Sequence, residues 1–248
     1  MNPDLQGKTA LVTGAARRVG AAIARRLHAA GADVVIHYRG SERDAEKLEA
    51  ELSALRPRSA CRVKADLLAP IAPRALVETA LAQFKRLDIV VNNASSFYPT
   101  AVGRIEAAHW DELMGSNLRA PLFLAQEAAP HLATHAGSIV NIVDIHAERP
   151  LKGYAVYSIA KAGLLGLTRS LALELAPAVR VNAVAPGAIA WPEDEQFAPA
   201  ERARIVATTP LARVGDPDAI AQAVHFLAGA SFVTGQVLAV DGGRSVFL

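Results

Sequence analysis

Short apolar runs alternate along this chain with longer segments in which apolar residues recur at helical spacing. The short runs predict seven β-strands, at residues 8–13, 33–38, 60–64, 88–91, 138–143, 180–184 and 237–240. The segments of helical spacing predict helices at residues 18–30, 41–55, 73–84, 106–114, 120–135, 157–175 and 216–227. Residues 186–210 show neither pattern clearly and are expected to be a looser segment.

The predicted strands are almost continuously apolar, as is typical of a parallel sheet covered by helices on both faces. Alternation of strands and helices along the whole chain predicts an α/β fold with a doubly wound parallel sheet of the Rossmann type. No linker or change of composition divides residues 1–248, so a single domain is expected. In such sheets ligands bind beyond the carboxyl ends of the strands, and the residues that follow each strand are therefore the candidates for function.

Composition narrows the classes of protein that this chain resembles. Its 248 residues are 52% hydrophobic and 20% charged, which supports one sizeable core. The net charge of +2 comes from scattered basic residues and gives no indication of a nucleic-acid or membrane partner. The single cysteine, Cys61, excludes an internal disulfide and a multi-cysteine metal site. Without a signal peptide or a long apolar stretch, the chain is expected to be cytoplasmic. No metal site is expected.

The turn after the first strand has the composition of a phosphate-binding turn. Residues 13–20 read TGAARRVG, so Gly14 and Gly20 lie between a predicted strand and a helix. Backbone N–H groups in such a turn approach a pyrophosphate, and the helix N-terminus favours its negative charge. Arg18 stands where a further glycine is expected, and a tight turn without a ligand remains the alternative.

The end of the second strand indicates which nucleotide would bind. An acidic residue there would contact a ribose 2′-hydroxyl, but Asp33 lies at the opposite end of that strand. Arg39, Ser41 and Arg17 instead offer two cations and a hydroxyl where a 2′-phosphate would lie. These residues predict NADPH as the cofactor, against the alternative that they are ordinary solvated charges. Ser41 is also the expected N-cap of the following helix.

Tyr157 and Lys161 are four residues apart at the start of a long predicted helix, so they share one face. A lysine ammonium close to a tyrosine lowers the pKa of the phenol and makes it a usable proton donor. The alternative is that these are two unrelated side chains on one helix. Elsewhere, Asp66 and Leu67 are placed to touch an adenine ring, and Asn117 interrupts a helical pattern, which predicts a bent helix or a buried water.

These features, in this order and spacing, resemble the short-chain dehydrogenase/reductase family from end to end. The matching residues are the turn at 13–20, Asp66, the NNA at 92–94, Asn117, the Tyr157/Lys161 pair and Pro186-Gly187. The resemblance implies that Tyr157 donates a proton, that Lys161 lowers its pKa and holds the nicotinamide ribose, and that Asn117 holds a water in a proton relay.

Two departures from the usual family pattern point to one branch. Asp144 stands where the family serine is expected, 13 residues before the tyrosine, and Arg18 replaces the middle glycine. Both resemble the pteridine reductases, as do the HYR-x-S at 37–41 and the NNASSFYPT at 92–100. The resemblance implies that Ser95 contacts cofactor or substrate and that Phe97 stacks on a pterin. A carboxylate at residue 144 can accept paired hydrogen bonds from a pterin edge or, when protonated, donate to a ring nitrogen.

The resulting expectation is an NADPH-dependent pteridine reductase that acts on dihydropterin or folate substrates as a homotetramer. The predicted cofactor site comprises Gly14, Arg17, Arg18, Val19, Gly20, His37, Tyr38, Arg39, Ser41, Asp66, Leu67, Asn93, Ala94, Ser95, Tyr157, Lys161, Pro186 and Gly187. The predicted substrate site comprises Arg18, Ser95, Phe97, Asp144, Tyr157 and Trp191, with residues 186–210 as a lid. Asp144, Tyr157, Lys161 and Asn117 are the predicted catalytic residues.

Three further expectations accompany this hypothesis. A carbonyl or 3-oxoacyl reductase of the same family is the alternative activity, and a non-catalytic NADPH-binding regulator is the alternative from another class. Trp191 either flanks the substrate or covers the core. The apolar C-terminus at 246–248, after the Asp-Gly-Gly at 241–243, is expected to contact another subunit.

Overall fold

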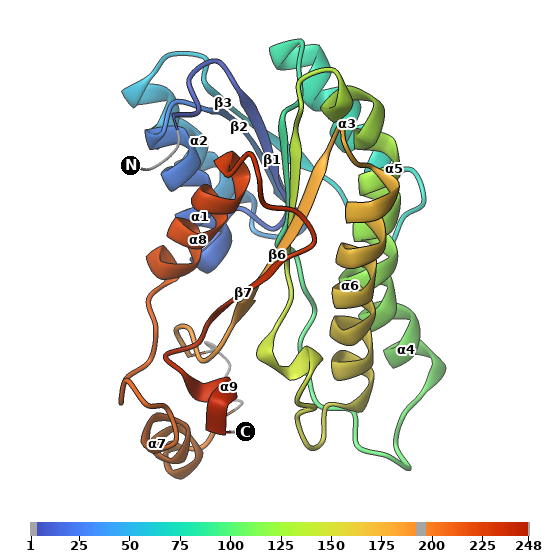
Figure 1. Cartoon of the computed structure of the whole chain (residues 1–248), viewed down its shortest axis with the longest axis vertical. Coiled ribbons are helices and arrows are strands. Elements are labelled where there is room, and N and C mark those ends of the chain that lie inside the picture. Colours follow the sequence, from blue (N-terminus) through green and yellow to red (C-terminus); the bar gives the residue numbers. More distant parts are fainter. Residues whose placement is uncertain (1–3, 192–196, 248) are drawn as a thin grey trace.

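A single parallel β-sheet forms the centre of the molecule, which was obtained as a computed structural model that describes residues 4–191 and 197–247. Its strand order is β3-β2-β1-β4-β5-β6-β7 (Figure 1). The strands are β1 (Thr9–Val12), β2 (Asp33–Tyr38), β3 (Ala60–Lys64), β4 (Ile89–Asn92), β5 (Ser138–Ile142), β6 (Arg180–Pro186) and β7 (Val237–Val240). The order reverses between β1 and β4, which is where doubly wound sheets bind ligands.

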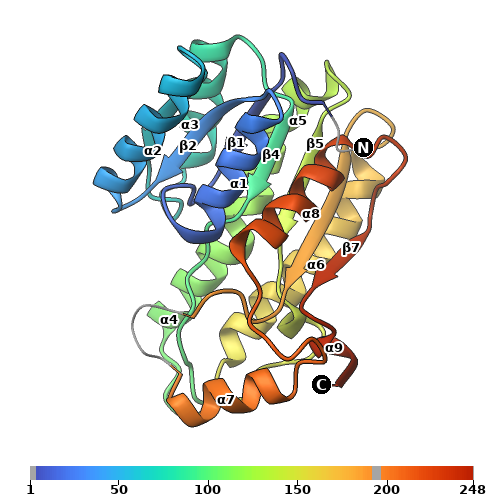
Figure 2. The ribbon, with the colours of Figure 1, turned by 90° about the vertical axis from the view of Figure 1, so that its left-hand side faces the viewer.

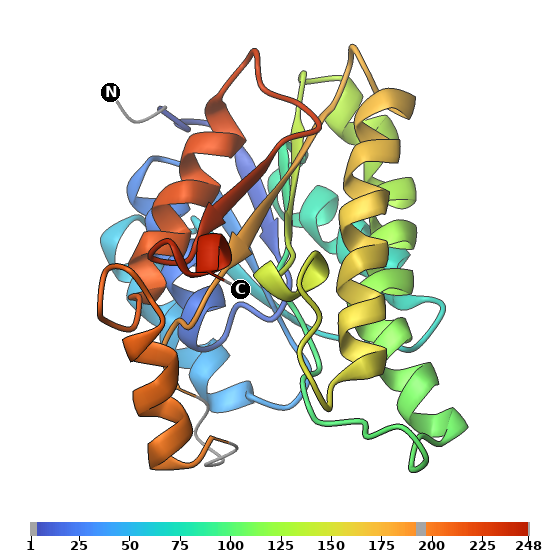
Figure 3. The ribbon, with the colours of Figure 1, turned by 60° about the horizontal axis from the view of Figure 1, so that its bottom comes forward.

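Helices cover both faces of the sheet. Helices α1 (Arg18–Ala29), α2 (Glu42–Leu55) and α8 (Pro217–Gly229) lie on one side, and α3 (Ala72–Phe84), α5 (Ala120–Ala133) and α6 (Ala155–Glu174) on the other (Figures 1 and 3). Successive residues of a strand enter different cores, since Val34 and Ile36 pack with α1 and α8 whereas Val35 packs with α3 and α5. This alternation explains why the strands had to be apolar on both sides.

The predicted fold class and all seven predicted strands are confirmed, with ends that differ by at most a few residues. The expectation of a looser segment at 186–210 is wrong in part, because α7 (Pro199–Ala207) forms there. Pro199 at its first turn favours a helix start, a signal that the density of prolines in this segment obscured. Within the described ranges, no helix is both long and apolar enough to cross a bilayer.

Four small elements are added at the carboxyl end of the sheet. They are α4 (Ala107–Met114), the π-helix η1 (Gly115–Arg119), the 3₁₀ turn η2 (Ile145–Ala147) and α9 (Arg244–Phe247). Figure 2 shows α4, α7 and α9 below the sheet, at the end to which the strands point. These elements therefore build walls around the place where ligands are expected.

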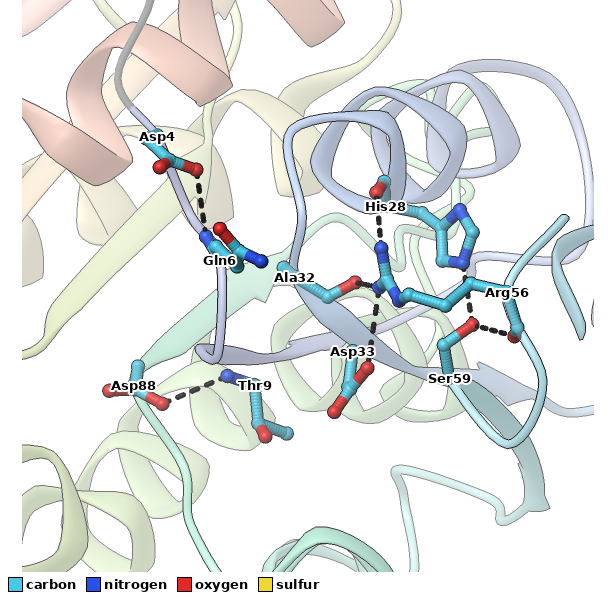
Figure 4. Close-up of polar contacts among 9 residues, drawn as sticks. All are labelled: Asp4, Gln6, Thr9, His28, Ala32, Asp33, Arg56, Ser59 and Asp88. Carbon is cyan, nitrogen blue, oxygen red and sulfur yellow. Dashed lines mark hydrogen bonds and ion pairs between the residues drawn. The ribbon is translucent and has the colours of Figure 1, made fainter.

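The amino end of the sheet is closed by internal polar contacts (Figure 4). Arg56 donates to the carbonyl oxygens of His28 and Ala32 and to the Asp33 carboxylate. The imidazole of His28 lies 2.6 Å from the Ser59 hydroxyl, which itself donates to the Arg56 carbonyl. These contacts tie the end of α1 to the loop before β3.

Asp88 connects neighbouring strands at this same end. Its carboxylate is buried and accepts the Thr9 backbone N–H at 2.8 Å (Figure 4). It also accepts two hydrogen bonds from the Arg86 guanidinium, at 2.8 and 2.6 Å. The charge of Asp88 is therefore fully engaged within the chain.

Candidate active site

A cleft of about 590 Å³ runs along the carboxyl end of the sheet. All the residues predicted for the cofactor site line it, together with Phe97 and Asp144. The rest of its wall was not predicted for the cofactor and consists of Ala16, Gly40, Leu68, Ser96, Ser116, Ile142, Val143 and Ile189. Most of these are apolar or small neighbours of predicted residues and carry no chemistry of their own that a sequence pattern reveals.

The glycine turn is packed too tightly for larger residues. A Cβ at Gly20 would lie 2.1 Å from the Gly14 carbonyl oxygen and 2.6 Å from the Asn93 amide nitrogen. That amide donates to the carbonyl oxygens of Thr13 and Gly14, at 2.9 and 3.1 Å. Asn93 thus holds the turn in place from β4, and the turn presents its backbone to the cleft.

His37 supports the same turn from β2. The Gly14 N–H donates to its Nδ1 at 3.1 Å, and its Nε2 lies 3.1 Å from the Ala65 carbonyl oxygen. This arrangement needs a neutral ring that carries its proton on Nε2. Burial lowers the pKa of His37 below its ordinary value of 6.5, against a smaller raising effect of the Ala65 carbonyl. The turn therefore depends on an uncharged histidine.

The outer end of the cleft carries the cations predicted for a 2′-phosphate. Arg39 is exposed, and none of the residues in 4–191 and 197–247 forms an ion pair with it. Arg17 lies 3.8 Å from the Asp44 carboxylate of α2. Ser41 occupies the N-cap position of α2, as predicted, but its side chain makes no capping hydrogen bond. Its backbone conformation there (φ −89°, ψ 58°) is not the extended one usual for a cap.

Asp144, Tyr157 and Lys161 meet at the centre of the cleft. The Tyr157 hydroxyl donates to Asp144 Oδ2 at 2.7 Å, and Asp144 Oδ1 accepts the His146 N–H at 2.8 Å. Lys161 Nζ donates to the Ile142 carbonyl oxygen at 2.9 Å and lies 5.7 Å from the centre of the Tyr157 ring. The end of β5 and one face of α6 fix these positions.

The expected lowering of the Tyr157 pKa by Lys161 is wrong for this arrangement. Burial raises the pKa of the Tyr157 phenol well above its ordinary value of 10, and the neighbouring Asp144 carboxylate raises it further. Burial also lowers the pKa of Lys161 to about 8, although Asp144 opposes this. The sequence spacing correctly placed the two side chains together, but it did not show that a carboxylate would be the hydrogen-bond partner of the phenol.

Asn117 lies behind the wall of the cleft rather than on it. It is buried in η1 and donates to the carbonyl oxygens of Leu113 and Ser96, at 2.9 and 3.0 Å. Ser95, which does line the cleft, donates to Asn117 Oδ1 at 2.6 Å. Asn117 lies in the π-helix, which interrupts the regular α-helical pattern there. This agrees with the prediction of a bent helix at Asn117.

Phe97 is clamped within an aromatic group. Its ring stacks on Tyr154 at 4.7 Å between centroids and meets the Tyr157 ring edge-on at 4.8 Å. Phe197 lies on it at 6.3 Å. Glu112 accepts hydrogen bonds from the Ser96 and Tyr98 hydroxyls, at 3.1 and 3.2 Å, and so holds the chain on both sides of Phe97. Tyr154 and Glu112 were not predicted from the sequence, and Phe197 lies in the segment 186–210 that was expected to form a lid.

A second cavity, of about 220 Å³, adjoins the cleft at Asp144 and Tyr157. Arg18, Phe97 and Trp191 line it, as predicted for a substrate site. Arg18 has φ 51°, in the left-handed region, and its Nη2 donates to the Ala190 carbonyl oxygen at 2.8 Å. The remaining walls include eight residues of the segment 186–210 that was expected to form a lid: Gly187, Ala188, Ile189, Ala190, Phe197, Glu201, Arg204 and Ile205. Four further wall residues were not predicted: Ile145, His146, Leu151 and Arg244.

Some expected features fall outside the described residues. The acidic part of the expected lid, residues 193–195, lies there, as do Leu248 and the side chain of Phe247. Among the residues that the structure describes, no group of three or more histidine, cysteine or acidic side chains is placed to hold a metal ion.

Comparisons with known proteins extend over nearly the whole chain. A family model described as enoyl-(acyl carrier protein) reductase matches residues 14–245. The chain is 40% identical to pteridine reductase 1 of Leishmania tarentolae, over 96% of each chain. It is 38% identical to the granaticin polyketide synthase putative ketoacyl reductase 2 of Streptomyces violaceoruber, again over 96% of each. It is 35% identical to a 3-oxoacyl-[acyl-carrier-protein] reductase of Staphylococcus aureus, over 95% of this chain and 97% of that one.

Among solved structures, the chain is similar to a blue fluorescent protein from a metagenomic library in complex with NADPH. The TM-score is 0.91 and the identity 38%, over 97% of this chain and 99% of that one. The relatives thus include reductases of different substrates, and overall similarity does not discriminate between them. The substrate must therefore be inferred from the side chains of the cleft and of the small cavity.

Proposed function

The chain belongs to the short-chain dehydrogenase/reductase family of oxidoreductases, and within it we propose that this protein is an NADPH-dependent pteridine reductase. The observation that carries the proposal is the hydrogen bond from the Tyr157 hydroxyl to the Asp144 carboxylate, 2.7 Å long, at the junction of the two cavities. A carboxylate in that place suits a ring with several N–H donors better than it suits a lone carbonyl oxygen.

The residues of the larger cleft fit NADPH. The glycine turn offers backbone N–H groups at a helix N-terminus for a pyrophosphate, and Arg39 offers a cation without a carboxylate partner in the described chain for a 2′-phosphate. Lys161, buried with Nζ near the end of β5, is placed to hold a ribose. When bound, NADPH would supply a hydride to the substrate.

Tyr157 is the proposed proton donor. Because its pKa is raised, the phenol keeps its proton at neutral pH until a basic atom of the substrate approaches. With a pKa of about 8, Lys161 is mostly charged at pH 7 and would stabilise the phenolate that forms. Ser95 and Asn117 form a hydrogen-bonded pair from the cleft towards the interior, consistent with a relay that returns the proton.

The small cavity is the proposed substrate site. Asp144 would accept paired N–H donors from the pterin edge, while Phe97 supplies an aromatic wall. Arg18 lines both cavities and would contact both ligands. Trp191 borders the small cavity, which favours a place beside the substrate over a purely covering role.

A carbonyl or 3-oxoacyl reductase is the second candidate function, and it is favoured by the similarity to reductases of acyl carrier substrates. The acidic residue at 144 argues against it, because a carboxylate repels the oxyanion that develops when a ketone is reduced. A non-catalytic NADPH-binding protein is the third candidate. It would bind the cofactor with no turnover.

The test is NADPH oxidation with dihydrobiopterin, dihydromonapterin and dihydrofolate in parallel, with an acetoacetyl thioester and an activated ketone as controls. We expect pterin turnover at least tenfold above that of the controls, and slower turnover when NADH replaces NADPH. Turnover of the thioester alone would contradict the proposal and support the second candidate. Cofactor binding without any turnover would support the third.

We further propose a cytoplasmic homotetramer. Exposed apolar side chains on α5 (Phe123, 44% exposed) and on the outer elements of the opposite side (Phe226 of α8, 49%, and Leu238 of β7, 39%) supply two separate surfaces, as a tetramer of paired dimers requires. Light scattering after gel filtration tests the assembly, and a monomer at micromolar concentration would contradict it.

A further inference from the structure

We propose that Arg204 and Arg244 form an anion-binding subsite on the wall of the small cavity, which selects pterins that carry a carboxylate-bearing tail. This inference rests on the proposed pteridine reductase function. It concerns the substrate class, which neither the sequence nor the relatives decide.

Two segments that are distant in the sequence build this part of the cavity wall. Arg204 belongs to the last turn of α7, and Arg244 begins α9 near the C-terminus. Arg244 Nη1 donates to the Ile205 carbonyl oxygen at 3.0 Å and also to the Thr208 hydroxyl. The guanidinium of Arg244 is therefore held firmly against the C-terminal end of α7.

Neither arginine has a carboxylate partner within 4 Å in the part of the chain that the structure describes. Glu201, on the same cavity wall, forms no ion pair with them. The nearby Asp241 is occupied elsewhere, since its oxygens accept the Gly243 and Ser245 backbone N–H groups at 2.9 and 2.7 Å. Both guanidinium groups thus retain N–H donors without an acceptor from the chain.

Placing these two cations together is unfavourable unless an anion joins them. Arg244 is only 8% exposed. Burial lowers its pKa, the charge of Arg204 lowers it further, and Asp241 partly offsets both effects. A bound carboxylate would accept hydrogen bonds from both guanidinium groups and relieve their mutual repulsion.

The position of the pair identifies the ligand to which this anion belongs. Both arginines line the small cavity, whereas neither lines the cleft proposed for NADPH. Asp144 and Tyr157 lie on the wall of the same small cavity. In the proposed arrangement, the pterin ring lies beside Asp144 and its side chain extends along the cavity towards Arg204. Dihydrofolate, whose tail ends in carboxylates, fits this arrangement better than dihydrobiopterin, whose short side chain is uncharged.

The test compares kcat/KM for dihydrofolate and dihydrobiopterin in the wild-type protein and in Arg204→Gln. Arg204 is exposed on α7, so its substitution should leave the fold intact, whereas Arg244 is buried. We expect the ratio of dihydrofolate to dihydrobiopterin kcat/KM to fall about tenfold, mainly through KM for dihydrofolate. Arg204→Lys should restore part of the ratio, because the charge returns without the planar pair of donors.

Two controls separate charge recognition from a change of shape. Arg213→Gln removes an exposed arginine that lines neither cavity, and should leave the ratio unchanged. Raising the salt concentration from 0.05 to 0.5 M should lower kcat/KM for dihydrofolate in the wild-type protein and have a much smaller effect in Arg204→Gln.

The outcomes distinguish the two proposals. If the wild-type protein reduces both pterins and the ratio is the same in Arg204→Gln, the subsite is wrong and the pteridine reductase proposal stands. An equal loss for both substrates also overturns the subsite, because it indicates a general effect on the cavity. If neither pterin is reduced, the proposed function fails, and the inference fails with it.

Discussion

Several arginines at the two ends of the sheet differ in whether they have a carboxylate partner. At the amino end, Arg56 is paired with Asp33 and Arg86 with Asp88, and the Asp88 carboxylate also accepts the Thr9 N–H. Figure 4 shows the contacts of Arg56 with Asp33 and of Thr9 with Asp88. At the carboxyl end, Arg39, Arg204 and Arg244 have no carboxylate partner in the described chain. Charges that are paired within the chain therefore stabilise the fold, whereas unpaired charges that face a cavity are available for a ligand.

Two histidines, one at each end of the sheet, also differ in their hydrogen-bond partners. His28 at the amino end lies against the Ser59 hydroxyl, whereas His37 at the carboxyl end accepts the Gly14 N–H of the glycine turn. Burial is the main cause that lowers the pKa of each ring. Both are expected to be neutral at pH 7, but only His37 connects its protonation state to the cofactor cleft.

The largest effect is expected at Tyr157. Tyr157→Phe removes the proposed proton donor and should lower kcat for the pterin substrate by about 10²–10⁴-fold, the range typical of a lost general acid. NADPH should still bind, since the hydroxyl contacts only Asp144 among the described residues. Stopped-flow single turnovers and cofactor fluorescence measure the two quantities.

Tyr98→Phe is the matched control for that variant. Its hydroxyl donates to Glu112 and lines neither cavity, so a much smaller loss of activity is expected. If Tyr157→Phe retained more than a tenth of wild-type turnover, Tyr157 would not be the proton donor.

An effect on stability alone is expected at Asp88. Asp88→Ala leaves the Thr9 N–H without its acceptor and Arg86 without its partner, which should lower the free energy of unfolding by about 2–3 kcal/mol. The kcat/KM value should change less than twofold, because Asp88 lies at the opposite end of the sheet from the site. Urea unfolding and steady-state kinetics check both parts.

The exposed pair of Arg74 and Glu78 offers the control, since it joins two solvated side chains on one helix. Arg74→Ala should lower the free energy of unfolding far less than Asp88→Ala, because the pair is fully solvated. A loss for Asp88→Ala no larger than that for Arg74→Ala would contradict the contrast drawn between buried and exposed pairs. A large loss of kcat/KM would contradict the separation of the two ends.

The smallest effect should be that of pH on the free energy of unfolding and on NADPH affinity. The folded-state pKa of each histidine lies below its ordinary value of 6.5, so the unfolded chain binds more protons than the folded one below about pH 6.5. The free energy of unfolding should therefore fall as pH falls through this range. NADPH affinity should fall as well, by a few-fold, because a charged His37 cannot accept the Gly14 N–H.

Two variants assign these effects to their rings. His37→Gln should remove most of the pH dependence of NADPH affinity between pH 5 and 7, whereas His28→Gln should remove part of the pH dependence of stability only. Isothermal titration with NADPH across this range makes the comparison. An identical pH profile of affinity in the wild-type protein and in His37→Gln would show that another group is responsible.

The fold could be predicted from sequence almost completely. Residues 33–38 and 60–64 became strands with the predicted ends. Residues 34–38 are all buried, as expected for an inner strand of a parallel sheet, whereas the edge strand at 60–64 exposes Arg62 and Lys64. Helix α7 was not predicted because it packs by little more than Ile205, so its hydrophobic pattern is weak.

The residues of the site that come directly after a strand could be predicted from the sequence. Gly14, Asp144 and Lys161 lie on one cleft because parallel strands and the helix after β5 bring them there. The direction of the Tyr157 pKa was not predictable, since it depends on burial and on which group bonds the phenol. Arg204 was expected only as part of the segment 186–210, and Arg244 was not predicted, because nothing in the sequence indicates that an arginine on a surface helix lines one cavity with an arginine near the C-terminus.

Arg18 carries a consequence for how this protein can change over evolutionary time. Its left-handed backbone costs an ordinary residue roughly 1–2 kcal/mol, a cost that glycine would avoid. Selection for thermal stability alone would therefore favour glycine at this position, whereas selection for a substrate that needs the guanidinium would keep the arginine. The residue found at position 18 in any descendant of this chain thus records which of the two demands was stronger.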